Sequence, residues 1–145
     1  MNLIYRKASI EDVIELKRLT DLMLEKTNLG LATVDKIKLI VSSNKCFVYC
    51  CFDDDKLVGY IAGILHNSIF NDVLRVSDIG VFIDPKYRGT SLGLTLIKKL
   101  EEWAKENNAK QIWMGQTTGF KIDKVKQMYE SLGYNITGFN ALKEL

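Results

Sequence analysis

The sequence lacks any run close to the ~20 apolar residues that span a membrane, and it has almost no excess of charge. Its net charge of +2 at pH 7 is too small to indicate nucleic acid or an anionic membrane as a partner. Residues 1–7 also lack the apolar stretch of a signal peptide. We therefore expect a cytoplasmic protein with no nucleic-acid and no membrane partner.

Histidine, cysteine and proline are also scarce. His66 is the only histidine, so a metal site would lack the usual partners, and we expect no metal. The three cysteines, Cys46, Cys50 and Cys51, lie together in one apolar run, which argues against a disulfide framework and favours buried, reduced thiols. Pro85 is the only proline and closes a predicted strand, because proline cannot continue a central ladder.

What remains is typical of one globular domain. The chain has 145 residues, of which 47% are hydrophobic, enough to fill a single core at this length. No internal repeat, linker or low-complexity segment interrupts it. We therefore expect a single domain over residues 1–145.

Hydrophobic spacing predicts an α/β (α+β) fold with a mixed sheet, because a hairpin region is followed by a strand–helix–strand unit that requires parallel pairing. Ser9 with Asp12, and separately Thr33, are expected to cap the first two helices, and Gly133 is expected to end the last one. The expected strands are 3–6, 46–52, 57–65, 73–83, 111–115, 134–136 and a short tail near 141–142, and the expected helices are 10–23, 34–41, 92–104 and 123–132.

The segment from Val81 to Leu94 is the most informative part of the chain. A strand ends, a turn of small residues follows, and a helix begins, so free N–H groups and the helix dipole should form an anion site. Gly89 and Gly93 would let a phosphate approach the backbone, and Arg88 adds a charged donor. The alternative is a plain connection between strand and helix. A Walker loop and a dinucleotide fingerprint do not fit, because their required residues are missing.

This turn resembles motif A of the GNAT superfamily of acyl-CoA-dependent N-acetyltransferases. Arg88, Ser91 and Gly93 occupy the positions of the family pattern Arg/Gln-x-x-Gly-x-Gly/Ala, and residues 83–85 occupy its valine-x-proline turn. Ser91 departs from the usual glycine. Residues 5–12 resemble the family's opening strand and helix, and residues 128–134 resemble its Leu-Tyr-Glu-Lys-Leu-Gly-Phe segment.

The resemblance implies that acetyl-CoA, as cosubstrate, lies in a cleft where the parallel strands 73–83 and 111–115 splay apart. The backbone of Val81, Phe82 and Ile83 would pair with the pantetheine arm. The alternative for Val81 and Ile83 is ordinary strand core, which is compatible with a backbone role. The pyrophosphate would be held by backbone N–H groups of Arg88, Gly89, Thr90, Ser91, Leu92 and Gly93.

The reaction implied by the resemblance is direct transfer of an acetyl group to a primary amine in a ternary complex. Tyr129 is the candidate acid that protonates the leaving thiolate; its place on an apolar helix stripe also fits simple packing. Asp78 is the candidate base, with a water relay to a more distant group as the alternative, or with a pairing to Arg75 and no catalytic role. Ile122 stands where the family often has an asparagine that contacts coenzyme A.

Two other functions stay open. A catalytically inactive GNAT-fold module could bind acyl-CoA or a partner, and a nucleotide-binding domain could use the same turn, although the phosphate-loop lysine is missing. The amine class is not readable from the residues expected to contact it, 66–72 and 29–34. Protein lysines, N-termini, polyamines, aminoglycosides and amino sugars therefore all remain open, as does a homodimer.

Overall fold

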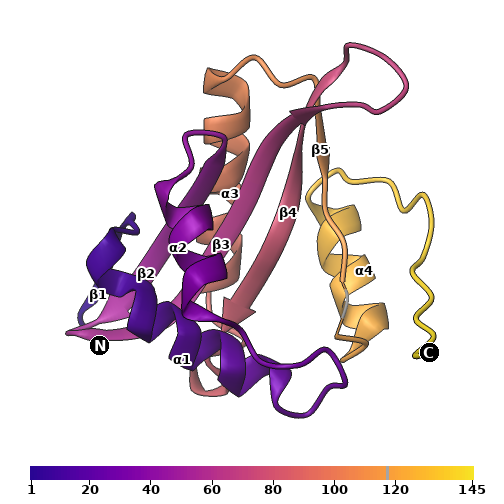
Figure 1. Cartoon of the computed structure of the whole chain (residues 1–145). Helices are drawn as coiled ribbons and strands as arrows, with labels where there is room; N and C mark the ends of the chain where they lie inside the picture. Colours follow the sequence, from indigo (N-terminus) through magenta and orange to yellow (C-terminus); the bar gives the residue numbers. More distant parts are fainter. Residues whose placement is uncertain (117) are drawn as a thin grey trace. The chain divides into compact units, whose positions relative to one another are not determined.

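The computed structural model describes residues 1–116 and 118–145, in two compact units, Met1–Met114 and Gly115–Leu145 (Figure 1). The first unit contains the sheet with three helices, and the second contains the last helix. The expectation of one domain over the whole chain stays a prediction. In chain order the elements are β1 (Leu3–Lys7), α1 (Val13–Leu24), α2 (Val34–Ser42), β2 (Cys46–Asp53), β3 (Lys56–Asn67), β4 (Leu74–Ile83), α3 (Leu92–Glu106), β5 (Gln111–Trp113) and α4 (Ile122–Ser131), with short 3₁₀ helices at Ile10–Asp12 and Pro85–Tyr87.

The sheet has five strands in the order β1-β2-β3-β4-β5. The first four pair antiparallel with their neighbours, and β5 pairs parallel with β4. The predicted mixed sheet is therefore confirmed. The fifth strand ends at Trp113 and not at Gly115 as expected, while β3 continues to Asn67 and takes in His66, which was expected in a loop.

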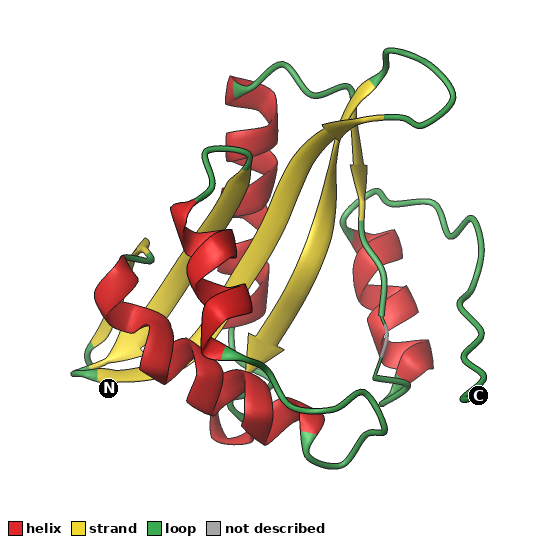
Figure 2. Cartoon of the chain, in the orientation of Figure 1, coloured by secondary structure: helices red, strands yellow, loops and turns green. Residues whose placement is uncertain are grey.

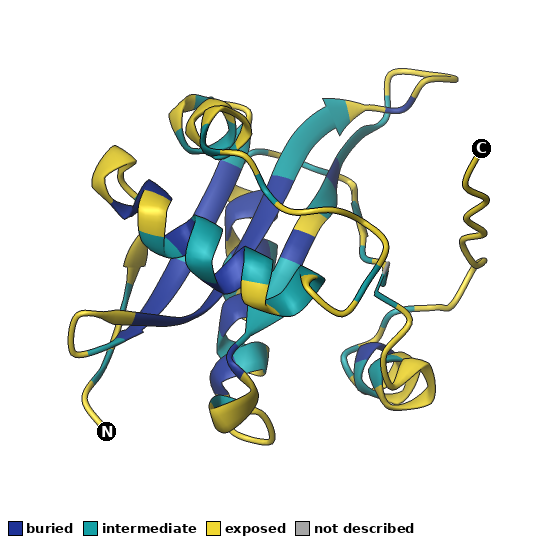
Figure 3. Ribbon diagram, turned by 60° about the horizontal axis from the view of Figure 1, so that its bottom comes forward, coloured by how far each residue is buried: buried dark blue, intermediate teal, exposed yellow. Residues whose placement is uncertain are grey.

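Helices cover both faces of this sheet (Figure 2). On one face, Leu16 and Leu19 of α1 pack with buried side chains of β2 and β3, and apolar residues of α2 pack against the same cluster. On the other face, α3 lies so close to β3 that a Cβ at Gly59 would stand 2.6 Å from Leu92. Figure 3 shows that the buried residues of this unit concentrate in the strands and on the inner sides of the helices.

The cysteines follow the alternation of a strand. Cys50 belongs to the cluster under α1, and its neighbour Cys51 faces the opposite side of β2. Both are fully buried and free, and Cys46 is free and half-buried. Burial raises the pKa of the Cys50 thiol to about 12, so this thiol stays protonated at neutral pH. The prediction of reduced cysteines in the core is confirmed for Cys50 and Cys51.

The start of the first helix forms the predicted capping box. The Asp12 carboxylate accepts hydrogen bonds from the backbone N–H of Ser9 at 2.7 Å and from both terminal nitrogens of Arg6 at 2.7 and 3.0 Å. Arg6 also lies over the Phe52 ring, 4.3 Å from its centre. Because Asp12 is buried, this bidentate ion pair holds β1 and the first turn of helix together.

A second polar contact joins α1 to the beginning of β3. Glu15 accepts hydrogen bonds from the Arg18 guanidinium at 2.8 and 3.0 Å and from the Leu57 N–H at 3.0 Å. Arg18 also donates to the Leu57 carbonyl at 2.7 Å. Both backbone groups of Leu57 are thus satisfied by one Glu–Arg pair. The Arg18 guanidinium lowers the pKa of the Glu15 carboxyl.

The segment after α4 differs from expectation. Gly133, with φ of +90°, ends the helix as predicted, and its N–H donates to the Glu130 carbonyl at 3.0 Å. The expected strands at 134–136 and 141–142 are wrong, because residues 134–145 contain no strand. Their apolar side chains stay exposed, Ile136 by 43% and Phe139 by 93%, so apolar spacing alone was a poor guide here. Within residues 1–116 and 118–145, no helix combines the length and apolar character needed to cross a bilayer.

Candidate functional site

The turn between β4 and α3 is built around a buried aspartate. The Asp84 carboxylate accepts a hydrogen bond from the Lys86 N–H at 3.0 Å and lies 3.5 Å from the Lys56 ammonium. Its own N–H donates to the Val58 carbonyl at 2.9 Å, which fixes the end of β4 against β3. Gly89 then adopts φ of +78°, a left-handed conformation that side chains disfavour, and this reverses the chain toward α3.

Most backbone N–H groups of this turn have no acceptor among the described residues. The Leu92 N–H points to the Thr90 hydroxyl at 3.3 Å, and the Thr95 N–H bonds to the Ser91 carbonyl at 3.0 Å. Because these donors lie at the start of a 15-residue helix, they form a cradle for an anion. The donors without an acceptor in the described chain are those of Gly89, Thr90, Ser91, Gly93 and Leu94.

The two glycines of this turn differ in the space around them. A Cβ placed on Gly93 would stand 3.0 Å from the Ile83 side chain, and one placed on Gly89 would meet nothing within 4 Å. Ser91 has φ of −73° and ψ of −1°, so the departure from the family's glycine strains no backbone angle. The Ser91 side chain is exposed and makes no capping hydrogen bond. Arg88, also exposed, places its guanidinium 3.4 Å from the Met23 sulfur at the end of α1.

Beside this turn, β4 extends well beyond its parallel partner. Only Arg75, Val76 and Ser77 pair with β5, whereas the rest of β4 pairs only with β3 among the described residues. In an antiparallel pair, alternate residues direct their N–H and C=O groups away from the partner strand. The edge opposite β3 therefore presents backbone groups from the segment containing Val81, Phe82 and Ile83.

A β-bulge interrupts β4 directly after Asp78, the candidate base. Ala62 pairs with Gly80 and Gly63 pairs with Asp78, so Ile79 is the extra residue. Asp78 therefore directly precedes the bulge and shares the face of Gly63. That face is covered by α3, because a Cβ at Gly63 would stand 2.6 Å from Leu100. Asp78 is half-buried there, on the face opposite Arg75, so the alternative pairing with Arg75 is not formed.

Tyr129 lies in the second unit and is the buried residue of α4. Its hydroxyl donates to the Gly115 carbonyl at 3.1 Å, and its ring lies against that of Tyr134, with centres 5.6 Å apart. The hydroxyl is thus oriented by a backbone acceptor of its own unit. Ile122, at the position of the family's asparagine, is 46% exposed.

A contact between the turn and the β2–β3 hairpin was not predicted from the sequence. The Tyr87 hydroxyl donates to the Asp53 carboxylate, which also accepts from the Asn2 N–H at 2.9 Å. The Asp53 carboxylate raises the pKa of Tyr87 to about 12. The only clue in the sequence was the acidic run at residues 53–55, between the expected strands 46–52 and 57–65.

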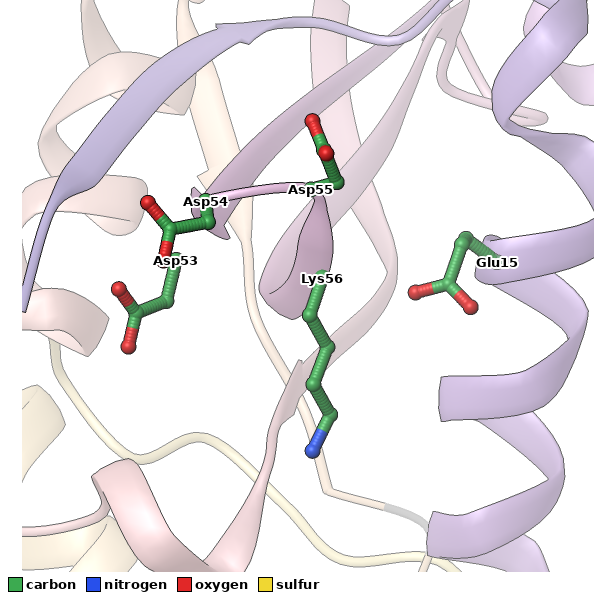
Figure 4. Close-up of a pocket in the computed structure, with 5 residues that line it drawn as sticks. All are labelled: Glu15, Asp53, Asp54, Asp55 and Lys56. Atoms are coloured by element: carbon green, nitrogen blue, oxygen red, sulfur yellow. The ribbon is translucent and has the colours of Figure 1, made fainter.

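The same acidic run borders an open pocket of about 500 Å³ (Figure 4). Two of its carboxylates already serve the fold, since Glu15 binds Arg18 and Leu57, and Asp53 binds Tyr87 and Asn2. Among the described residues, no group of three or more histidine, cysteine, aspartate or glutamate side chains is placed to hold a metal ion. The pocket is lined by Glu15, Asp53, Asp54, Asp55 and Lys56.

Known structures share this architecture. An acetyltransferase from Trypanosoma brucei superposes with a TM-score of 0.80 at 18% identity, covering 99% of this chain and 100% of that chain. An aminoglycoside acetyltransferase from an uncultured soil metagenomic sample gives 0.78 at 16% identity, covering 99% and 96%. A ribosomal-protein-alanine N-acetyltransferase from Brucella melitensis biovar Abortus 2308 gives 0.76 at 11% identity, covering 99% of each chain. At these identities the likeness shows the fold alone.

The sequence itself carries the family assignment. No curated protein gives a significant match to the chain. The model of the acetyltransferase (GNAT) family, however, matches residues 16–134, which include the strands β2 to β5, the turn between β4 and α3, and α4. The family and the fold agree over most of the chain, and the protein is a member of the GNAT acetyltransferase family.

Proposed function

We propose that the protein is an acetyl-CoA-dependent N-acetyltransferase that acts on a primary amine by direct transfer in a ternary complex. The observation that carries this proposal is the turn from Gly89 to Leu94, with its five backbone donors that have no acceptor in the described chain. Such donors at a helix N-terminus suit a pyrophosphate. Membership in the GNAT family supports coenzyme A as the molecule that brings it.

The residues present fit this ligand. Gly89 borders open space, since a Cβ there would meet nothing within 4 Å, and the exposed Arg88 guanidinium adds a charged donor. Val81, Phe82 and Ile83 would offer backbone groups to the pantetheine arm along the edge of β4 that faces away from β3. Acetyl-CoA supplies the activated acetyl group as a thioester.

The chain's own residues would then assist the transfer. Backbone N–H groups at the bulge, around Ile79 and Gly80, would stabilise the carbonyl oxygen as it gains negative charge. We propose Asp78, directly or through water, as the acceptor of the amine's proton. We propose Tyr129 as the donor to the leaving thiolate, in line with the resemblance of its segment to the family pattern. A nitrogen–carbon bond forms, the carbon–sulfur bond breaks, and one proton passes from amine to base and one from acid to sulfur.

Two measurements test the proposal. Titration calorimetry with coenzyme A and with dephospho-coenzyme A should detect binding of both, because the pyrophosphate is common to them. No binding of either would overturn the cofactor assignment. A panel of amines with acetyl-CoA should then release free thiol in the presence of at least one amine. Binding without thiol release from any amine would support the non-catalytic acyl-CoA-binding module.

A further inference from the structure

Four side chains from three strands share one face of the sheet beyond the helices that cover its centre. His66 is on β3, Arg75 and Ser77 are on β4, and Trp113 is on β5. The register pairs His66 with Arg75 and Ser77 with Trp113, and cross-strand partners share a face. Figure 1 shows the free end of the β3–β4 hairpin, with β5 beside it, extending past α1 and α2. We call His66, Arg75, Ser77 and Trp113 the strand-end patch.

The first property of the strand-end patch is a cation without a counter-ion. The Arg75 guanidinium lies over the Trp113 ring, 4.9 Å from its centre, and Trp113 is 45% exposed. No carboxylate of the described residues pairs with Arg75, and its buried Nε has no hydrogen-bond acceptor. A guanidinium fixed on an aromatic ring, with donors unused, is suited to a planar anion such as a carboxylate.

The second property is a hydrogen bond to His66 that orients the Ser77 hydroxyl. His66 Nδ1 lies 3.0 Å from the Asn67 carbonyl, so this nitrogen carries the proton. With a neutral imidazole, Nε2 is then the acceptor, and the Ser77 hydroxyl, 2.7 Å away, donates to it. The lone pairs of the Ser77 oxygen are left to accept a hydrogen bond from another donor. An amine N–H is such a donor.

The third property is location. Ser77 precedes the bulged residue Ile79 by two positions, roughly 7 Å along a strand, and Arg75 lies two positions further. Under the proposed function the thioester carbonyl lies at the bulge. A small acceptor on the strand-end patch would therefore place its amine toward the bulge and its other polar end toward Arg75.

We propose that the strand-end patch binds the acceptor substrate and that this substrate is a small amine carrying a carboxylate, such as a free amino acid. Arg75 binds the carboxylate, Trp113 supports the guanidinium, and the Ser77 oxygen accepts a hydrogen bond from the amine. The proposal rests on the proposed acetyl transfer. It disfavours polyamines and aminoglycosides, because a second positive charge would face Arg75.

Matched acceptor pairs test the inference. Thiol release from acetyl-CoA is measured with phenylalanine against phenethylamine and phenylalaninamide, and with lysine against cadaverine, with phosphoethanolamine as an arm for a phosphate-bearing amine. We expect kcat/KM to be about 10- to 100-fold higher for each amino acid than for its partner without a carboxylate, as expected for one bidentate charged contact. Equal values, or preference for the neutral amines, would overturn the inference while the proposed function stands. A clear preference for phosphoethanolamine would also overturn it, in favour of a phosphate ligand.

Variants of Arg75 test whether this residue causes the preference for amino acids. Arg75→Gln should raise KM for amino acids about 10- to 100-fold, with little change for the neutral amines, and Arg75→Lys should restore part of the loss. Lys105→Gln removes one exposed positive charge from the end of α3. It should leave KM unchanged for both the amino acids and the neutral amines. Coenzyme A affinity should be the same in all three variants. If Arg75→Gln raises KM equally for amino acids and neutral amines, Arg75 does not bind the substrate carboxylate, and the inference is overturned. If no amine supports thiol release in the unchanged protein, the proposed function itself fails, and the patch loses its role with it.

Discussion

Two regions at the same end of the sheet, the start of α1 and the turn before α3, differ in whether their polar groups have hydrogen-bond partners. Around the start of α1, the Asp12 and Glu15 carboxylates are each surrounded by donors, including an arginine and a backbone N–H. In the turn from Gly89 to Leu94, five backbone donors have no acceptor among the described residues. Both regions lie beside ends of β strands, so the difference does not arise from the type of element.

The contrast separates polar groups that stabilise the fold from polar groups that the fold leaves without an acceptor among the described residues. A satisfied, buried carboxylate contributes to stability and is unavailable to anything else. Exposed donors at a helix start contribute little until an anion arrives. Tyr129 does not follow this division, because its hydroxyl has an acceptor in Gly115 while the family resemblance places it in turnover. Changes in each region should therefore affect different measurements.

The largest effect is expected at Tyr129, whose hydroxyl has a structural hydrogen bond and is also the proposed acid. Tyr129→Phe keeps the ring and its contact with Tyr134 but removes the hydroxyl. If the hydroxyl protonates the thiolate, turnover should fall about 10²- to 10⁴-fold in the thiol-release assay. Coenzyme A affinity should change little, and loss of the hydrogen bond to Gly115 should lower the free energy of unfolding by about 1 kcal/mol.

An unchanged rate would assign Tyr129 to the groups that only stabilise the fold. If the hydroxyl serves only in the hydrogen bond to Gly115, the same loss of about 1 kcal/mol would occur with no change in turnover. Full activity in the Phe variant with lowered stability would therefore contradict the acid role.

The turn should respond in binding and not in stability. Gly93→Val adds a Cβ that would stand 3.0 Å from the Ile83 side chain, and its two methyl groups add bulk in the first turn of α3. We expect coenzyme A affinity, measured by calorimetry, to fall about 10- to 100-fold because charged hydrogen bonds to phosphate are blocked. Gly138→Val is the matched control, since a Cβ there meets nothing within 4 Å. Unchanged affinity in the first variant would place the ligand elsewhere.

The region at the start of α1 should give the reverse result. Asp12→Asn removes the charge that binds Arg6 and Ser9, and we expect the free energy of unfolding to fall by about 1–2 kcal/mol in urea titrations. This loss of unfolding free energy is smaller than for a fully buried ion pair because Arg6 remains partly exposed. Coenzyme A affinity should be unchanged, and a parallel loss of affinity would show that the two regions are coupled.

Acid should weaken this region without mutation. The Arg6 guanidinium lowers the pKa of the Asp12 carboxyl below its ordinary value of 3.8, and Arg18 lowers that of Glu15. A carboxyl with a depressed folded pKa stabilises the protein above its unfolded pKa, and the contribution disappears as pH falls through the folded value. Unfolding free energy should therefore decrease below about pH 4, with a shallower decrease in Asp12→Asn. Parallel curves for the two proteins would exclude Asp12 as a source of the pH dependence.

Local patterns in the sequence predicted most of the fold. The capping box at Ser9 and Asp12, the cap at Thr33 and the stop at Gly133 all appear, because each depends on neighbouring residues alone. The strands after Gly133 were wrong because a strand exists only where a neighbour pairs with it. No pattern within one segment contains that information.

The candidate site also combines features that depend on neighbouring residues with features that depend on how the strands align. The turn from Arg88 to Gly93 could be predicted because its small residues adjoin a helix start. The bulge at Ile79 could not, since register depends on how β3 and β4 align. Arg75 and Trp113 are 38 positions apart in sequence (113 minus 75), and only the sheet brings the guanidinium over the ring.

The smallest expected effect lies at Ser91, the departure from the family pattern. Its hydroxyl caps nothing in the fold and its backbone angles are unstrained, so Ser91→Ala should leave the melting temperature unchanged. If the hydroxyl donates to a phosphate oxygen, its loss should weaken coenzyme A binding about two- to tenfold, the range of one hydrogen bond. Ser91→Gly separates this from a steric effect, because it removes the hydroxyl and also the Cβ. Equal weakening in both variants would identify the hydroxyl as a ligand. Tighter binding in Ser91→Gly would show instead that the serine narrows the cradle, and the turn would then bind its anion through backbone donors and Arg88 alone.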